Sequence, residues 1–193
     1  MVEALVRHGK VEKKIFYIRK GDEEYTDLLG GRVPKYALRP EACGTLDEAT
    51  SFLGFARALP TSPRTKQILI DIQRDIYQMM AELAFTPDIR QRRYHITAED
   101  VARIEQETDR LSEEVPLPPQ FILPSDTVAG GVLDVARAVI RRAERVVVRL
   151  AHEGEFDNSE VLSYLNRLSS LLFIVARYED HIAGVTPTLA KEV

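Results

Sequence analysis

The sequence predicts an all-α protein, a five-helix antiparallel bundle with an extended N-terminal arm. Five segments carry apolar residues at three- and four-residue spacing, which is the spacing of one helix face. Aromatic residues make up only 7% of the 193 residues and Trp is absent, so the core must be mostly aliphatic. Short connections between the five segments favour antiparallel neighbours. We therefore expect a single domain over 1–193, with an arm at 1–40, the bundle at 41–184 and a tail at 185–193.

The arm differs from the rest of the chain in charge and pattern. It holds nine basic and six acidic residues, and Gly30, Gly31 and Pro34 interrupt any periodicity. Such breakers predict a loop-rich segment. At best, a short strand is expected over 14–18, where apolar residues are consecutive.

Each helix is predicted from its apolar stripe and its start signals. Thr45 with Glu48 could form a capping box that opens the first helix. The second should run over 63–85, because Pro63 suits a first turn. The third should open at a Thr97–Asp100 capping box and reach about residue 112, before a Pro-rich linker. The fourth and fifth should span about 126–152 and 158–182, with Gly184 ending the fifth.

The inward residues of the fourth helix are expected to be Val132, Val135, Ala136, Val139, Ala143, Val146 and Leu150.

Composition excludes several classes of function. The net charge of −4 argues against a dedicated nucleic-acid binder. The single cysteine, Cys43, rules out an intramolecular disulfide, and the four scattered His residues make a zinc site unlikely to form from this chain. No apolar run approaches the roughly 20 residues of a membrane span. Because the first residues lack a signal-peptide core, a soluble cytoplasmic protein is expected.

The fourth predicted helix is the segment richest in candidate chemistry. Arg137, Arg141, Glu144 and Arg145 share one face, and residues 137–149 hold five Arg and one acid. Guanidinium groups match phosphate oxygens, so this face could bind a polyphosphate. The spacing also fits a solvated face or an ion-pair seam between subunits.

Three other features allow both a functional and a structural interpretation. The loop around Gly21 could cradle phosphate with its backbone amides, or could be an ordinary surface turn. Asp47 and Glu48 fall in the first turn of the first predicted helix, where acidic residues cap and favour the helix dipole. Phe121 follows a rigid Pro-rich turn and could pack in the core or contact a ligand.

Six segments together resemble the ATP:cob(I)alamin adenosyltransferases of the propanediol-utilisation type. The resemblance covers about residues 14–180, and the matching segments occur in the family's order. They are Leu28-Leu29-Gly30-Gly31-Arg32-Val33-Pro34-Lys35, Gly44-Thr45-Leu46-Asp47-Glu48, Phe121-Ile122-Leu123-Pro124, Ala136-Arg137 with Arg141-Arg142-Ala143-Glu144-Arg145, Asn166-Arg167-Leu168-Ser169, and Ala176-Arg177-Tyr178-Glu179.

The resemblance implies a homotrimer of five-helix bundles with active sites between subunits. Members of this family bind ATP with Mg²⁺, hold cobalamin without its lower ligand and assist its reduction to cob(I)alamin. The Co(I) attacks the 5′ carbon of ATP and triphosphate leaves. A flavoprotein reductase and a cobalamin-dependent acceptor enzyme are expected as further partners, whereas no nucleic acid or membrane is. No protein side chain is expected to ligate the Mg²⁺ that accompanies ATP.

The resemblance also assigns roles by position. Phe121 matches the aromatic residue that displaces the lower ligand of the corrinoid. Asp47 and Arg137 match an intersubunit salt bridge, and with Arg141 they form the expected catalytic set. The ATP-binding positions are Arg19, Lys20, Gly21, Asp22, Thr26, Lys35, Arg142, Glu144, Arg145 and Asn166.

Departures from the family pattern leave an alternative open. The family's loop usually reads Thr-x-Thr-Gly-Asp-x-Gly-x-Thr, and here Ile18, Lys20 and Glu24 replace two threonines and a glycine. Further departures are Thr50, Ser125-Asp126, Asp134 and Ser170, which replace a usual Asn, Gly-Gly, His and Asp. We expect these changes to cluster on the nucleotide side. The alternative is a catalytically impaired paralogue that binds a corrinoid or another ligand as a carrier, sensor or partner-binding module.

Overall fold

The computed structural model describes residues 21–59, 61–85 and 94–191, and within them it confirms the predicted all-α bundle. A short hairpin, β1 (Tyr25–Leu28) and β2 (Gly31–Pro34), precedes five helices. The helices are α1 (Leu38–Ala58), α2 (Pro63–Ala84), α3 (Ala98–Glu114), α4 (Val128–His152) and α5 (Ser159–Ile182). None of the described helices is both long and apolar enough to cross a bilayer.

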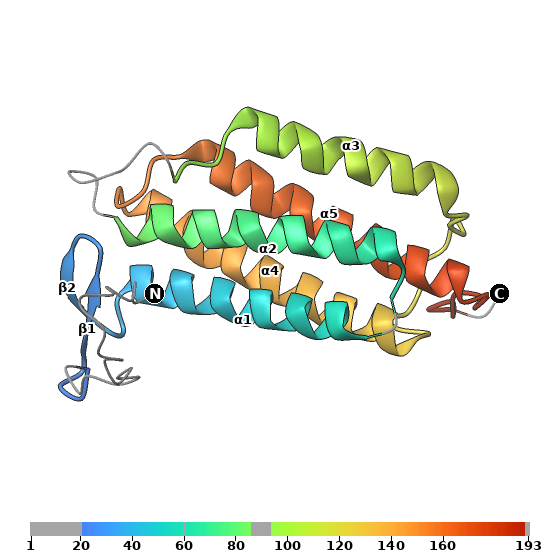
Figure 1. Ribbon diagram of the computed structural model, residues 1–193, viewed down its shortest axis with the longest axis horizontal. Coiled ribbons are helices and arrows are strands. Elements are labelled where there is room, and N and C mark those ends of the chain that lie inside the picture. Colours follow the sequence, from blue (N-terminus) through green and yellow to red (C-terminus); the bar gives the residue numbers. More distant parts are fainter. Residues whose placement is uncertain (1–20, 60, 86–93, 192–193) are drawn as a thin grey trace, which may run out of the picture.

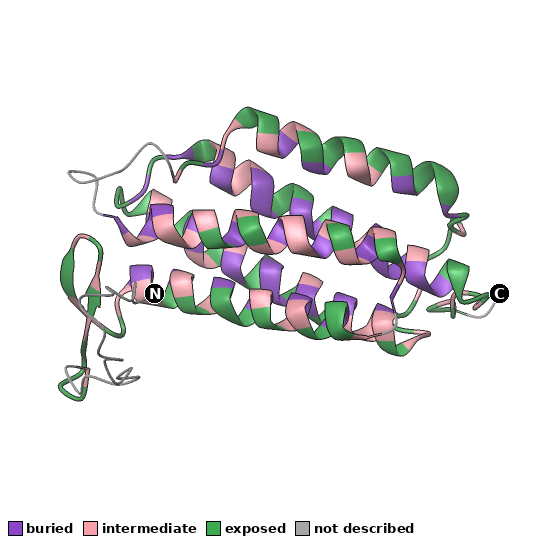
Figure 2. Cartoon of the chain, viewed as in Figure 1, coloured by how far each residue is buried: buried purple, intermediate pink, exposed green. Residues whose placement is uncertain are grey.

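Helix α4 lies at the centre of the packing, against α1 on one side and α5 on the other. Helix α2 packs on α1, and α3 covers α5 (Figure 1). Buried residues follow the inward faces of all five helices (Figure 2) and form one aliphatic core. The inward stripe predicted for α4 is wrong at Val135, which is 44% exposed, whereas Val147 is fully buried. The apolar residues of α4 therefore cover a wider part of the helix surface than the face that is buried.

Four helices begin where their start signals predict. Pro63 is the first residue of α2, where its missing N–H costs no helical hydrogen bond. At the start of α3, the Asp100 carboxylate accepts the Thr97 backbone N–H and hydroxyl, both at 3.0 Å. Thr127 accepts the Gly130 N–H at 2.9 Å, and Asn158 accepts the Glu160 N–H at 3.0 Å. Each cap satisfies a donor that the first turn leaves unpaired.

Helix α1 begins at Leu38, earlier than the predicted start at Thr45. Thr45 is a mid-helix residue whose hydroxyl donates to the Glu41 carbonyl at 2.8 Å, so the expected capping box is absent. Pro40 lies in the first turn, where a proline is tolerated because its N–H would have no helical partner. Buried Arg39 fixes this end of the helix by donating to the Leu83 and Phe85 carbonyls at 2.9 and 3.1 Å.

The arm also contains a β-hairpin, although its glycine and proline residues predict a loop. β1 and β2 are antiparallel, with Tyr25 opposite Pro34 and Leu28 opposite Gly31. Gly31 has a φ of +136°, a conformation that side chains rarely adopt, so the glycines mark a hairpin turn rather than a loop. The strand expected over 14–18 lies outside the described residues.

The last described residues pack against the connection that precedes α4. Gly184, with a φ of +72°, ends α5 as predicted. Beyond it, the Leu123 N–H donates to the Thr188 carbonyl and the Ala190 N–H donates to the Phe121 carbonyl, both at 2.8 Å. Residues 185–191 are thus attached to the α3–α4 connection, at the end of the bundle opposite the hairpin (Figure 1).

Candidate functional site

The predicted arginine face lies on α4, and its members differ in what they contact. Half-buried Arg137 donates through Nε to Asp134 Oδ1 at 3.0 Å. Arg142 forms an ion pair with Glu48 of α1. The Arg145 guanidinium donates to the Arg141 carbonyl at 2.8 Å. The exposed Arg141 guanidinium has no hydrogen bond or ion pair with any described residue, so it is available to an external anion.

Two acidic residues of α1 lie beside this face rather than at a helix start. Because α1 begins at Leu38, Asp47 and Glu48 fall in the middle of the helix, and the cap-and-dipole interpretation is wrong. Glu48 neutralises Arg142. The exposed Asp47 carboxylate has no ion pair among the described residues, and within the chain Arg137 pairs with Asp134 instead.

Asn166 joins the arginine face from α5. Its amide Nδ2 donates to Glu144 Oε1 at 2.9 Å, and its amide oxygen accepts from Arg167 Nη1 at 2.6 Å. The structure therefore places Asn166 and Glu144 in contact, as positions that bind one ligand should be. The pair offers an amide and a carboxylate beside the exposed guanidinium groups.

The hairpin brings a second group of predicted residues together. A Cβ built on Gly21 would lie 3.5 Å from Lys35 Nζ, so the Gly21 backbone and the Lys35 ammonium are neighbours. Asp22 is exposed and Thr26 half-buried beside them. The Lys35 N–H donates to the Glu24 carbonyl at 2.9 Å, and Glu24 has a φ of +64°. The loop thus keeps a left-handed conformation that suits the family's usual glycine. Arg19 and Lys20 lie outside the described residues.

Phe121 lies on the connection between α3 and α4. Its ring is 90% exposed, so the core interpretation of this aromatic residue is wrong. The backbone around it is nevertheless fixed by the bonds to residues 188–190. A phenyl ring displayed on an ordered backbone is suited to contacting a ligand or a neighbouring chain.

One chain does not bring the hairpin and the arginine face into contact. The hairpin lies beyond the N-terminal end of α1, and the Phe121 connection lies at the opposite end (Figure 1). Among the described residues, none from 21 to 31 or from 33 to 36 forms a hydrogen bond or ion pair with α4. Helix α4 has 25 residues, which corresponds to about 37 Å.

A buried charge cluster beneath the Phe121 connection was not predicted. Arg177 is 2% exposed, and its Nη2 lies 2.9 Å from both Asp134 Oδ2 and Asp180 Oδ2. Burial raises the pKa of the Asp180 carboxyl, and the hydrogen bond from Thr127 opposes that shift. The available signal was an Arg and an Asp at i, i+3 inside an apolar stripe, where unpaired charges are not tolerated.

Two departures from the family pattern, Asp126 and Asp134, have polar partners within the chain. Asp126 follows Phe121 on the same connection and accepts from Thr188, whereas Asp134 of α4 accepts from Arg177, which also donates to the Leu123 carbonyl. The clustering of departures on the nucleotide side stays a prediction.

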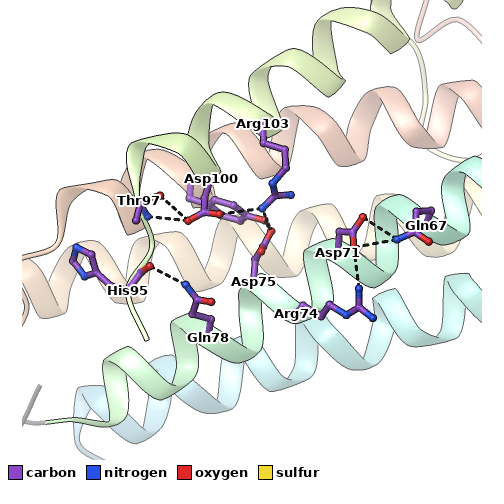
Figure 3. A network of polar contacts seen from close by, with 10 residues as sticks. Gln67, Asp71, Arg74, Asp75, Gln78, His95, Thr97, Asp100 and Arg103 are labelled. Carbon is purple, nitrogen blue, oxygen red and sulfur yellow. Dashed lines mark hydrogen bonds and ion pairs between the residues drawn. The ribbon is translucent and has the colours of Figure 1, made fainter. Parts of the chain in front are cut away.

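Charged residues of α2 and α3 also form pairs within the chain. Between α2 and α3, Asp75 Oδ2 accepts from Arg103 Nη2 at 2.7 Å and from the Tyr164 hydroxyl at 2.5 Å (Figure 3). Burial is the main cause that raises the pKa of Tyr164. Within the described part of the chain, no group of three His, Cys, Asp or Glu residues could hold a metal ion.

Comparisons with known proteins agree with the predicted resemblance. A family model described as cobalamin adenosyltransferase matches residues 16–179. A corrinoid adenosyltransferase of Bacillus subtilis is 37% identical over 88% of both chains, and the human corrinoid adenosyltransferase MMAB is 38% identical over 84% of this chain and 67% of its own. A phenylalanine-to-alanine variant of a PduO-type ATP:corrinoid adenosyltransferase from Lactobacillus reuteri, solved with cobalamin and ATP, superposes with a TM-score of 0.86. It is 30% identical and covers 92% of this chain and all of its own.

Proposed function

The chain belongs to the cobalamin adenosyltransferase family, and from its geometry we propose where it binds the two substrates of that reaction. It is a corrinoid adenosyltransferase, which moves the 5′-deoxyadenosyl group of ATP to the cobalt of a reduced corrinoid and releases triphosphate. We assign the triphosphate to Arg141 and Arg145 of α4 and to Lys35 of the hairpin. Phe121 is assigned to the corrinoid, on the side of the cobalt that loses its lower ligand.

The guanidinium of Arg141, which has no hydrogen bond or ion pair with any described residue, is the observation that carries this assignment. When the bond to the 5′ carbon breaks, negative charge accumulates on the leaving triphosphate. A fixed cation that gains interaction energy as this charge develops lowers the barrier, and its guanidinium fork can bind two phosphate oxygens at once. Arg137 and Arg142 already contact carboxylates of the same chain, so they are better suited to holding the face in shape than to receiving phosphate.

We propose that the complete site forms between copies in a homotrimer. The hairpin and the Phe121 connection are at opposite ends of one bundle, so a site that uses both must take them from different chains. Apolar side chains along α1 and α4 support an interface, since Phe55, Val135 and Val148 are 53%, 44% and 46% exposed. The exposed Asp47 carboxylate is free to pair with Arg137 of a neighbour.

The other expected partners stay part of the proposal. Mg²⁺ would enter with ATP, held by the phosphates, and a reductase would supply electrons to the corrinoid. Delivery of the product to a cobalamin-dependent enzyme and a cytoplasmic location are expected on the same grounds. The impaired-paralogue alternative is not favoured, because the matched relatives are named as adenosyltransferases and Glu24 preserves the loop conformation.

The test is an anaerobic assay with Mg²⁺, ATP and chemically reduced cobalamin, followed by the corrinoid absorption spectrum. We expect the wild-type protein to form adenosylcobalamin and Arg141→Ala to lower kcat by about 100-fold, the loss typical of one transition-state donor. Arg110→Ala is the matched control, because Arg110 is an exposed arginine of α3 with only a 3.7 Å contact to Glu107. Full activity in Arg141→Ala would contradict the assignment, and no product from the wild type would contradict the function.

A further inference from the structure

The polypeptide that follows α5 is held mainly by hydrogen bonds rather than by packing. Residues 185–190 are exposed or half-buried. A cavity of about 690 Å³ separates them from the Pro-rich linker, between Val185, Pro187 and Leu189 on one side and Pro116 and Pro118 on the other. With so little apolar burial, the position of this segment depends on its polar contacts.

Apart from the Val185 N–H, which donates to the Asp180 carbonyl of α5 at 3.0 Å, these contacts reach the connection that carries Phe121. Ile122 pairs with Leu189 in an antiparallel bridge, which is bounded by the two 2.8 Å backbone bonds described above. The Asp126 carboxylate adds two more bonds, because it accepts the Thr188 hydroxyl at 2.5 Å and the Thr188 N–H at 3.0 Å. Bonds to an ionised carboxylate are about twice as strong as neutral ones.

We propose that Asp126 and Thr188 are positioning residues for Phe121. Their bonds fasten residues 185–190 to the α3–α4 connection, and this attachment holds the exposed ring of Phe121 where it can exclude the corrinoid's lower ligand. The inference rests on the role that the proposed function gives to Phe121. Neither residue needs to touch the substrate, since both act through the backbone on either side of the ring.

The local geometry supports an effect on Phe121 rather than on the fold. The rest of the connection is held by α5, because Thr127 donates to Asp180 at 2.6 Å and Arg177 donates to the Leu123 carbonyl at 3.4 Å. The Phe121 carbonyl, in contrast, accepts its bond from Ala190. Loss of the segment would therefore leave the base of the connection in place and release the residue that carries the ring.

A reporter that is independent of catalysis can test the attachment. Because the chain contains no Trp, Phe121→Trp introduces a single tryptophan, whose fluorescence can be excited selectively over that of the tyrosines. We expect its fluorescence anisotropy to fall when Thr188→Val removes the hydroxyl donor. Thr188→Ser should restore the anisotropy, because it keeps the hydroxyl. Thr186→Val is the matched control, since Thr186 is an exposed threonine of the same segment that forms no hydrogen bond with the described residues of the connection.

The catalytic test uses the chain with Phe121 intact. The assay supplies ATP, Mg²⁺, a Co(II) corrinoid that must lose its lower ligand, and a reduced flavoprotein that donates the one electron needed to form Co(I). We expect Thr188→Val, and to a smaller extent Asp126→Asn, to lower kcat by about tenfold, as expected for one charge-assisted bond. KM for ATP should be unchanged, and the absorption spectrum should show less bound corrinoid without its lower ligand. Circular dichroism melting monitors the fold of each variant.

The outcomes separate this inference from the proposed function. Wild-type anisotropy in both Thr188→Val and Asp126→Asn, or an equal loss in Thr186→Val, would overturn the inference. A fall in anisotropy with unchanged kcat and corrinoid spectrum would overturn it as well, because the ring would then not need to be held. If the wild type forms no adenosylcobalamin, the proposed function fails, while the anisotropy still decides whether the segment holds residue 121.

Discussion

Replacing Arg177 with methionine should be among the most destabilising single changes in this chain. The substitution keeps the aliphatic volume of the side chain but removes the cation that lies 2.9 Å from both Asp134 and Asp180. Breaking a buried ion pair from one side typically costs about 3–5 kcal/mol, because the remaining charge is left without a partner in the interior.

The remaining contacts place the expected cost at the lower end of that range. Asp134 keeps the 3.0 Å bond from Arg137, and Asp180 keeps the 2.6 Å bond from Thr127. Asp180 is 1% exposed and can also bind a proton, which would relieve its charge. We therefore expect a loss of about 3 kcal/mol at pH 7.5, or about 6–12 °C in Tm for a domain of this size.

Urea unfolding followed by circular dichroism measures this loss, at one fixed protein concentration because assembly would couple to unfolding. The loss should shrink as the pH falls toward the raised pKa of Asp180, because protonation of this carboxyl removes the bare charge. Arg149→Met is the control, since Arg149 and Glu153 form an exposed pair at 3.2 Å that is worth less than about 1 kcal/mol. A cost for Arg177→Met no larger than the control's would refute the argument that charge burial dominates here.

Two further predictions concern titration and backbone strain. Hydrogen bonds from Thr188 lower the pKa of Asp126, so Asp126 stabilises the fold above the usual carboxyl pKa and loses that effect as the pH falls through its lowered value. Burial raises the pKa of Asp180, so its contribution has the opposite sign and weakens as the pH rises through the window above its usual value. Asp126→Asn and Asp180→Asn should therefore change the pH dependence of urea midpoints in opposite directions. Changes in the same direction would contradict the opposite pKa shifts of the two carboxyls. Glu24→Gly should raise stability by about 1 kcal/mol by relieving the φ of +64°. The same change should also tighten ATP binding in calorimetry, because it removes a negative charge from the loop. Weaker binding would contradict the idea that the Glu24 carboxylate repels the phosphates of ATP.

The sequence predicts helix starts well where a cap is formed by residues close in the chain. Thr97 with Asp100, Thr127 and Asn158 all act over two or three residues, so their side chains alone decide the local hydrogen bonds. The start of α1 at Leu38 differs from the predicted start at Thr45, because Pro40 is typical of a helix breaker and Thr45 with Glu48 resembles a capping box. Pro40 is compatible with a first turn, and Gly44 lies on an exposed part of the helix with no atom within 4 Å of its Cβ position.

Long-range features were harder to predict from the same residues. The four-residue strands of the hairpin are too short to show an alternating pattern. The arginine face of α4 followed from spacing, but which guanidinium groups are already paired depends on Glu48 and Asp134, and only the fold places these residues. Arg177 belongs to one of the segments that resemble the family. Its burial depends on how α4 packs against α5, which the sequence alone does not predict.

The contacts of Asp134 have a consequence for any substitution at this position. Asp134 accepts hydrogen bonds from both Arg137 and Arg177. Replacement by a neutral residue would leave buried Arg177 with one fewer counter-charge, so such a change should be tolerated only together with a second change that restores the charge balance around Arg177.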